Sequence, residues 1–277
     1  MRGIMNLNQA PLFIRIVFCA MLLGPLQGGC GPQLEEFCQH PNQKHSMIRG
    51  IQIHCGFSES QREVIAHDLE TLMQLNLKGP SADALQSLLE TSDLTPASLQ
   101  TWLTKRIHTL LPPNIDSAPG PEGLVAHNYG AALFESARKT GSHQAWIPGF
   151  GTIAVDSPRI GLVQLTQSYF DSMSDIEVGP RTSRHPEEPL RRLGLLFHEA
   201  RHSDGNGSDA GYPHVTCPSG HSSASKLACD ATPTGAYMIQ SRFLQAAAEG
   251  CTECSASEKT ILSYEAFQAK RQVMPVK

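Results

Sequence analysis

The chain has 277 residues, of which 40% are hydrophobic and 17% charged, and its formal net charge is −4. A chain of this length can build one sizeable domain with an accessory part. Its slightly acidic balance provides no basic surface for a polyanion, so we expect no nucleic-acid partner.

Residues 1–29 are expected to form an export signal. Arg2 and Arg15 accompany the apolar run 16–23, which is too short to span a bilayer as a helix and has the length of a signal-peptide core. The sequence Leu-Gln-Gly-Gly before Cys30 resembles a bacterial lipoprotein processing site, in which the cysteine receives lipid. We therefore expect a protein exported to the bacterial cell envelope, either anchored to the membrane by lipid on Cys30 or secreted after ordinary cleavage.

The cysteine count favours disulfide bonds. The chain has eight cysteines, and an even number remains if Cys19 leaves with the signal and Cys30 is lipidated. An even count in an exported protein is typical of a disulfide framework. Proximity in the sequence suggests the pairs Cys38–Cys55, Cys217–Cys229 and Cys251–Cys254, although sequence alone does not select a connectivity.

The first half of the chain is expected to be mainly helical. Residues 30–57 are rich in Gly, Pro, Gln and His and predict an irregular, disulfide-tethered N-terminal segment. Helical patterns with start or stop signals then follow at 58–77, 82–89 and 95–111. They predict a helical subdomain over 58–111, in which Asp68 has no recognisable partner in the later part of the chain. The Pro- and Gly-rich stretch 112–123 is expected to be a linker.

The second half, 124–277, is expected to be the main domain. A helix is predicted over 124–138, and short runs that favour strands predict a small sheet at 145–147, 151–155 and 159–166. A helix starting at Pro189 follows, and then a long Gly-, Ser- and Pro-rich loop over 203–233, of a length that is usually functional. Two helices close the chain, at 235–248 and 257–272. The fold class expected from this order is α+β.

The helix after Pro189 carries the pattern H-E-x-x-H, with His198, Glu199 and His202. Two histidines four apart on a helix project from the same face, so both imidazoles can bind one metal ion. Glu199 stands next to the first histidine, where its carboxylate can act on a water molecule at the metal. A glycine-rich stretch from Ser203 onwards is expected to end the helix.

With this motif, the region 145–248 resembles the zincin metallopeptidases. Zincins have a small twisted sheet whose edge strand lies above the motif helix and binds extended peptide. The resemblance implies that His198 and His202 bind zinc and that Glu199 is the general base and acid. A catalytic zinc site keeps three protein ligands and one open position. We favour His214 as the third ligand, with the alternatives Asp230, Asp209 and, less favoured, His221.

The function expected from the sequence is an exported, zinc-dependent peptidase that cleaves peptide or protein substrates. Tyr237 is a candidate hydrogen-bond donor to the oxyanion of the reaction. The alternative is a non-catalytic cell-surface lipoprotein or binding module with a degenerate or purely structural metal site. A zinc amidase or peptidoglycan hydrolase is a further alternative, because the same chemistry hydrolyses any amide.

Overall fold

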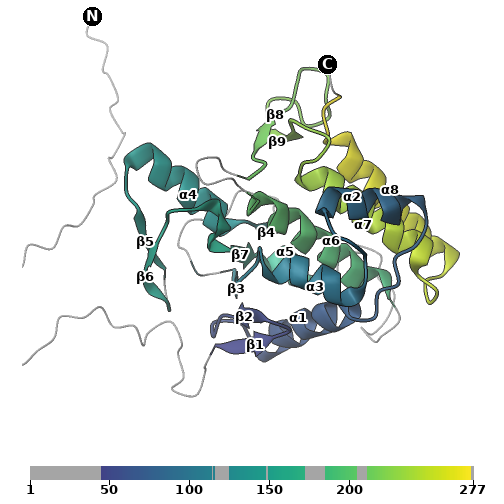
Figure 1. Cartoon of the computed structure of the whole chain (residues 1–277), viewed down its shortest axis with the longest axis horizontal. Coiled ribbons are helices and arrows are strands. Elements are labelled where there is room, and N and C mark those ends of the chain that lie inside the picture. The colour runs from purple at the N-terminus through teal and green to yellow at the C-terminus, as the bar shows by residue number, and fades with distance from the viewer. Residues whose placement is uncertain are drawn as a thin grey trace, which may run out of the picture. The chain divides into compact units, whose positions relative to one another are not determined.

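The computed structural model of the chain describes residues 45–113, 115, 125–147, 149–171, 185–204 and 211–275. The expected export signal, Cys30, Cys38, Asp209 and most of the expected linker lie outside these residues. The described part is a mixture of helices and small sheets, so the α+β class is confirmed (Figure 1).

The main sheet is mixed, with strand order β1-β2-β3-β7-β4. Strands β2, β3 and β7 are parallel, while β1 and β4 are antiparallel to their neighbours at the two edges. The strands span Ser46–Ile48 (β1), Ile51–Ile53 (β2), Thr109–Leu111 (β3), Leu162–Leu165 (β7) and Ala126–His127 (β4). The register pairs Leu110 with Val163 and Ala126 with Leu165.

Three of these strands correct the sequence-based expectations. The segment 30–57 is not wholly irregular, because β1 and β2 form a hairpin whose turn residues Arg49 and Gly50 have φ values of 49° and 84°. Positive φ at both positions is the geometry of a tight two-residue hairpin turn. The helix expected over 95–111 ends at Thr104, and its last residues form β3, because pairing with β2 and β7 outweighs the local helical pattern.

The first three helices lie where the sequence predicted helices. They are α1 (Glu59–Leu72), α2 (Pro80–Leu89) and α3 (Pro96–Thr104). Ser58 caps α1 in a capping box with Gln61, and Thr95 caps α3.

A second layer of small elements follows β4. Asn128 caps α4 (Tyr129–Thr140), so the helix expected at 124–138 is preceded by a strand and begins later. The sequence suggested one small sheet from the strands β5 (Gln144–Ile147), β6 (Gly151–Ala154) and β7. In the structure, β5 and β6 pair only with each other in a separate hairpin, and β7 belongs to the main sheet. The short helices η1 (Pro158–Ile160) and α5 (Gln167–Phe170) flank β7.

The central helix is α6 (Glu187–His202), which starts two residues earlier than predicted and carries the motif. Most of its residues are buried, because α1 and α3 pack on one side and α7 (Ala236–Gly250) and α8 (Ala256–Arg271) on the other. Phe197 stacks between Trp102 and Phe243, at ring-centroid distances of 5.4 and 4.7 Å. The motif helix is therefore held by apolar contacts with its neighbouring helices.

One hydrophobic core joins both halves of the chain. Its buried members include Leu69 and Trp102 from the N-terminal helices, Val163 from the sheet, and Phe197 and Ile239 from the later helices. The described residues from 45 onwards lie in one compact unit, and residues on both sides of the expected linker at 112–123 contribute to this core.

A buried ion pair, which no sequence pattern indicated, also joins the two halves. Arg192 of α6 donates from Nε and Nη2 to the carboxylate of Asp68 in α1, at 2.8–3.0 Å. The hydroxyl of Tyr169 donates to the same carboxylate at 2.9 Å. Burial alone would lower the pKa of Arg192, but the hydrogen bonds with Asp68 and the negative charges around the guanidinium together more than offset this and raise it.

The stretch 203–233 is not one loop, because it contains the hairpin of β8 (His214–Thr216) and β9 (Leu227–Asp230). The predicted bonds Cys217–Cys229 and Cys251–Cys254 are both present. The third predicted bond involves Cys38, which is outside the described residues.

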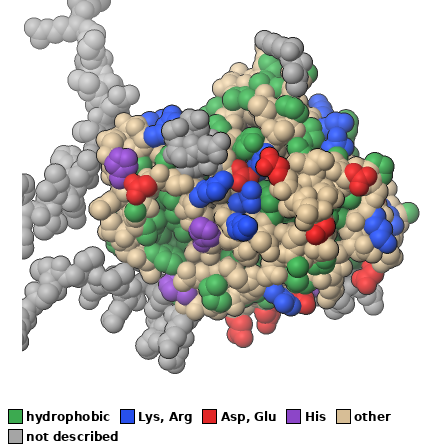
Figure 2. All heavy atoms as spheres, in the orientation of Figure 1, with side chains coloured by type: hydrophobic (Ala, Val, Ile, Leu, Met, Phe, Trp, Pro, Cys, Tyr) green, Lys and Arg blue, Asp and Glu red, His purple; other side chains and the backbone are tan. Residues whose placement is uncertain are grey.

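The described part of the chain has a surface of mixed charge on the face drawn (Figure 2), and its helices are too short or too polar to span a membrane. On the face drawn in Figure 2, Lys and Arg side chains lie close to Asp and Glu side chains, a mixed pattern that keeps the local field small. None of the described helices is long and apolar enough to cross a membrane.

Candidate metal centre

Three histidines meet at the C-terminal end of α6. His198 and His202 lie one turn apart on this helix, and their Nε2 atoms are 3.3 Å apart. The Nε2 of His214, the first residue of β8, lies 3.2 Å from the Nε2 of His198. The structure therefore brings His214 to the two motif histidines, as the sequence had favoured. His221 is not in this group, because its Nε2 lies 2.8 Å from the carbonyl oxygen of Arg271.

The spacing of these nitrogens fits a metal ion. Nitrogens bound to tetrahedral zinc at 2.0–2.1 Å lie about 3.3–3.4 Å from one another. The two Nε2–Nε2 distances, 3.2 and 3.3 Å, are close to that value. The ligand atoms of the three residues all lie within 4.8 Å of one another, so the donor set suits one ion with a fourth position open.

Burial keeps the rings of His198 and His202 neutral, which is the form that binds a metal. Burial first, and then the proximity of His202 and His214, lower the pKa of His198 well below its usual value. Burial and then His214 lower the pKa of His202 to about 3. At neutral pH both rings therefore hold a nitrogen lone pair without having to lose a proton.

Polar groups lie behind the rings of His202 and His214. The Nδ1 of His202 lies 3.0 Å from the carbonyl oxygen of Tyr212, which can accept its proton and leave Nε2 free. The Nδ1 of His214 lies 3.3 Å from Oδ1 of Asp230. Asp230, an alternative ligand in the sequence interpretation, is thus placed behind the third histidine. Asp209 lies outside the described residues.

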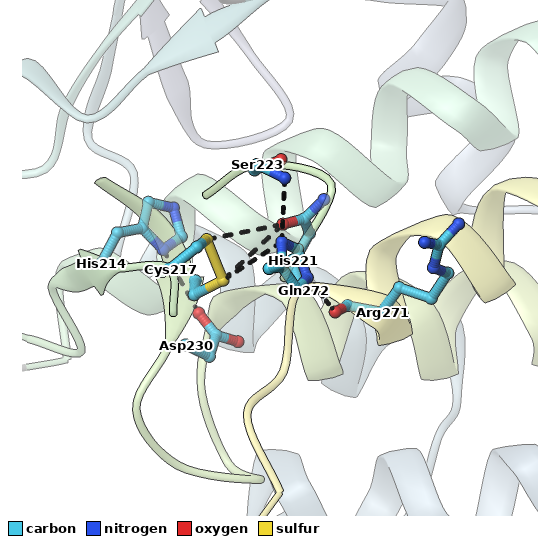
Figure 3. The surroundings of a disulfide bond; sticks show 8 residues. His214, Cys217, His221, Ser223, Asp230, Arg271 and Gln272 are labelled. Carbon is cyan, nitrogen blue, oxygen red and sulfur yellow. Dashed lines mark hydrogen bonds and ion pairs between the residues drawn. A yellow bond between two sulfur atoms is a disulfide. The ribbon is translucent and has the colours of Figure 1, made fainter. Parts of the chain in front are cut away.

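The hairpin holds Asp230 and His214 together. The two residues are direct partners in the β8–β9 register, and the Cys217–Cys229 disulfide closes the hairpin beside them. Figure 3 shows His214 and Asp230 on one side of this disulfide and Gln272 on the other. The backbone N–H of Asp230 donates to the carbonyl of Gln272 at 2.8 Å, and its Oδ2 accepts from the N–H of Tyr237 at 2.8 Å. The carboxylate is therefore fixed from several sides.

Glu199 lies beside the histidines and is 7% exposed. Burial raises its pKa to about 8, and a hydrogen bond from the backbone of Asn128 opposes that rise. The side chain of Asn128 also donates to the carbonyl oxygen of Glu199 at 2.6 Å and to Ser203 Oγ at 2.9 Å, while its Oδ1 accepts from the N–H of Ala131. Asn128 follows β4 directly, so one side chain ties the edge strand to the end of the motif helix.

A cleft of about 380 Å³ opens at the histidines. Its walls come from β4, the first turn of α4, the end of α6, the β8–β9 hairpin and α7. The outer edge of β4 has no strand partner in the part of the chain that the structure describes. An extended chain in the cleft would therefore meet unpaired backbone groups of β4.

Tyr237 also lines this cleft. Its ring stacks on that of His214 at 4.7 Å between centroids and meets His198 edge-on at 4.5 Å. Burial, and then the charges of Glu199 and Asp230, raise its pKa to about 12. The hydroxyl therefore keeps its proton at neutral pH and can act as a donor.

Sequence reasoning missed the roles of Asn128 and Arg201. Arg201, a variable position of the motif, is buried, donates to the carbonyl of Thr234 at 3.0 Å and stacks on the ring of Tyr212 at 3.8 Å. It thereby supports the residue whose carbonyl faces His202. An asparagine two residues after an apolar pair is a helix-cap signal, but nothing local indicates that its amide reaches α6.

Comparisons with known proteins identify no relative: no family model, curated protein or solved structure matches this chain.

Proposed function

We propose that this protein is an exported zinc-dependent peptidase of the zincin type. The observation that carries the proposal is the meeting of three imidazoles beside a buried glutamate, in a cleft bordered by β4, an edge strand of the main sheet in the described part of the chain. Asn128, which follows the edge strand β4, contacts the end of the motif helix, and the resemblance to zincins implies an edge strand above that helix.

His198, His202 and His214 would hold the ion. Zinc bound there supplies a Lewis acid that polarises a scissile carbonyl and lowers the pKa of water to about 7. The chain's own residues provide the rest of the chemistry, and each has a separate task.

Glu199 moves the proton. A pKa of about 8 leaves a fraction of Glu199 ionised at neutral pH, and this carboxylate form takes a proton from the attacking water as the oxygen–carbon bond forms. It then gives that proton to the amide nitrogen as the carbon–nitrogen bond breaks. The proton count balances, because the water supplies a hydroxyl to the new acid and a proton to the new amine. Tyr237 donates a hydrogen bond to the oxygen on which negative charge develops.

The substrate is an extended peptide. Unpaired backbone groups on β4 can add it as a further strand, and the small side chains Ala126, Ala131 and Ala132 leave room in the cleft beside that strand. A folded loop would have to open before it could pair in this way, so unfolded or extended segments are the expected targets.

Replacement of Glu199 by Gln tests the proposal in the full chain. The variant should bind zinc like the wild type and lose at least about a thousandfold in cleavage of an unfolded protein, because proton transfer is removed while the ligands stay. Glu59→Gln, at the exposed start of α1, is the matched control and should remain active. Hydrolysis by Glu199→Gln at the wild-type rate would contradict the mechanism, and cleavage of peptidoglycan but not of protein would favour the amidase alternative.

Export and lipid attachment are part of the same proposal. The sequence before Cys30 and the disulfides of the later chain both favour an oxidising compartment. Detergent phase partition of the protein expressed in bacteria should move from the detergent to the aqueous phase in Cys30→Ala. Unchanged partition would remove the lipid anchor and leave simple secretion.

A further inference from the structure

A second group of metal-ligating side chains lies at the other end of the motif helix. His185 precedes α6, Glu187 is its first residue, and Glu258 lies in the first turn of α8. The Nδ1 of His185 is 3.2 Å from Oε1 of Glu187, and the ligand atoms of all three residues lie within 4.8 Å of one another. Eleven residues of helix separate Glu187 from His198, or about 16 Å, so this cluster is distinct from the histidine site.

One carboxylate oxygen of the cluster is buried and accepts no hydrogen bond from the described residues. Glu187 is 3% exposed, and its Oε2 is buried and has no hydrogen-bond partner among the described residues. Burial first, and then the charge of a second carboxylate, Glu258, raise the pKa of Glu187, while a backbone hydrogen bond and His185 oppose that rise. A buried carboxylate oxygen without a donor, facing a like charge, costs free energy unless a cation or a proton is present.

The ligand atoms of Glu258 and His185 lie close to those of Glu187. Oε2 of Glu258 accepts from the backbone N–H of Ser255 in the capping box of α8, and the carboxyl group of Glu258 also lies within hydrogen-bonding reach of Glu187. His185 offers a ring nitrogen, and the remaining Glu187 oxygen lies beside it. The three side chains therefore offer one nitrogen and two carboxylate oxygens to a common point.

We propose that His185, Glu187 and Glu258 bind a second divalent cation of the zinc class, which links the starts of α6 and α8. One imidazole with two carboxylates suits a zinc-like ion whose other positions are filled by water, whereas calcium takes six to eight oxygens. The link complements the ion pair of Arg191 with Glu265, which joins the same two helices farther along. It is a structural site, and it does not depend on the peptidase proposal.

Metal stoichiometry of the full chain tests the proposal. After equilibration with zinc and removal of excess, the wild type should hold two equivalents by elemental analysis. His198→Ala/His202→Ala should hold one, Glu187→Gln/Glu258→Gln should hold one, and the combined variant should hold none. Glu253→Gln, an exposed carboxylate close to the start of α8, is the matched control and should hold two.

A thermal measurement covers variants that lose stability for other reasons. Zinc should raise the Tm of the His198→Ala/His202→Ala protein, and the rise should vanish when the half-exposed His185 is also replaced by Ala. A single equivalent in the wild type that disappears with His198 and His202 would overturn the second site and leave two carboxylates sharing a proton. A single equivalent that disappears with Glu258 would instead support this site and contradict the peptidase proposal.

Discussion

The zinc affinity of the histidine site should depend on Asp230, although this carboxylate does not face the ion. Its Oδ1 lies 3.3 Å from the Nδ1 of His214, where it can fix the ring and increase the basicity of Nε2. Removal of such a supporting group typically weakens metal binding by about 10- to 100-fold, or about 1.4–2.7 kcal/mol. We expect Asp230→Asn near the lower value, because its oxygen can still accept, and Asp230→Ala near the upper value.

The assay is competition with a chromogenic zinc chelator at neutral pH, and a double-mutant cycle makes it specific. Once His214 is replaced by Ala, a further Asp230→Ala change should leave the residual zinc affinity unaltered, because the ring that Asp230 orients is gone. Asp93→Asn, which alters a carboxylate at the start of α3, controls for general effects on the fold. If Asp230→Ala binds zinc as tightly as the wild type, or if the two changes are additive, the orienting role is refuted.

Three further predictions concern stability. Asp68→Ala should lower the free energy of unfolding by about 3–5 kcal/mol in urea denaturation, because it leaves Arg192 buried without its partner; a loss below about 1 kcal/mol would contradict the pairing. Replacing Cys217 and Cys229 by Ala opens a loop with a sequence separation of 12, which should lower the free energy of unfolding by about 3 kcal/mol. Zinc binding should also weaken because the hairpin loosens. Equal zinc affinity before and after the change would show that the hairpin holds without the disulfide. Hydrogen bonds from the backbone and side chain of Thr95 lower the pKa of Asp93 to about 2, so its contribution is present above about pH 4 and lost as the pH falls through 2. The Tm gap between wild type and Asp93→Asn should therefore close between these pH values, and a constant gap would contradict this.

Local spacing predicted the part of the site that lies on one helix. His198 and His202 meet because residues four apart share a face of any α-helix, and the helix ends after His202 as expected. His214 was favoured from its place in a long loop after the motif, and the structure brings it to the other two. The hairpin that carries it was not predicted, because its strands are only a few residues long and are separated by a turn-rich segment.

Long-range pairing explains what the sequence did not reveal. Strand β3 has an apolar pattern that continues the preceding helix, and only its place between β2 and β7 makes it a strand. The hydrogen bond of Arg192 with Asp68 joins residues 124 positions apart, and that of Tyr169 with Asp68 joins residues 101 apart. No local pattern distinguishes such a buried pair from two surface charges.

The N-terminal helices cannot serve as a cleavable inhibitory segment. They supply the acidic partner of Arg192, and Trp102 covers the aromatic ring that immediately precedes the first motif histidine. Removing these helices would leave the charge of Arg192 buried without its partner. It would also expose one side of α6, the helix that carries two of the three histidines. A proteolytic cut that leaves the fold intact must therefore fall outside 58–111.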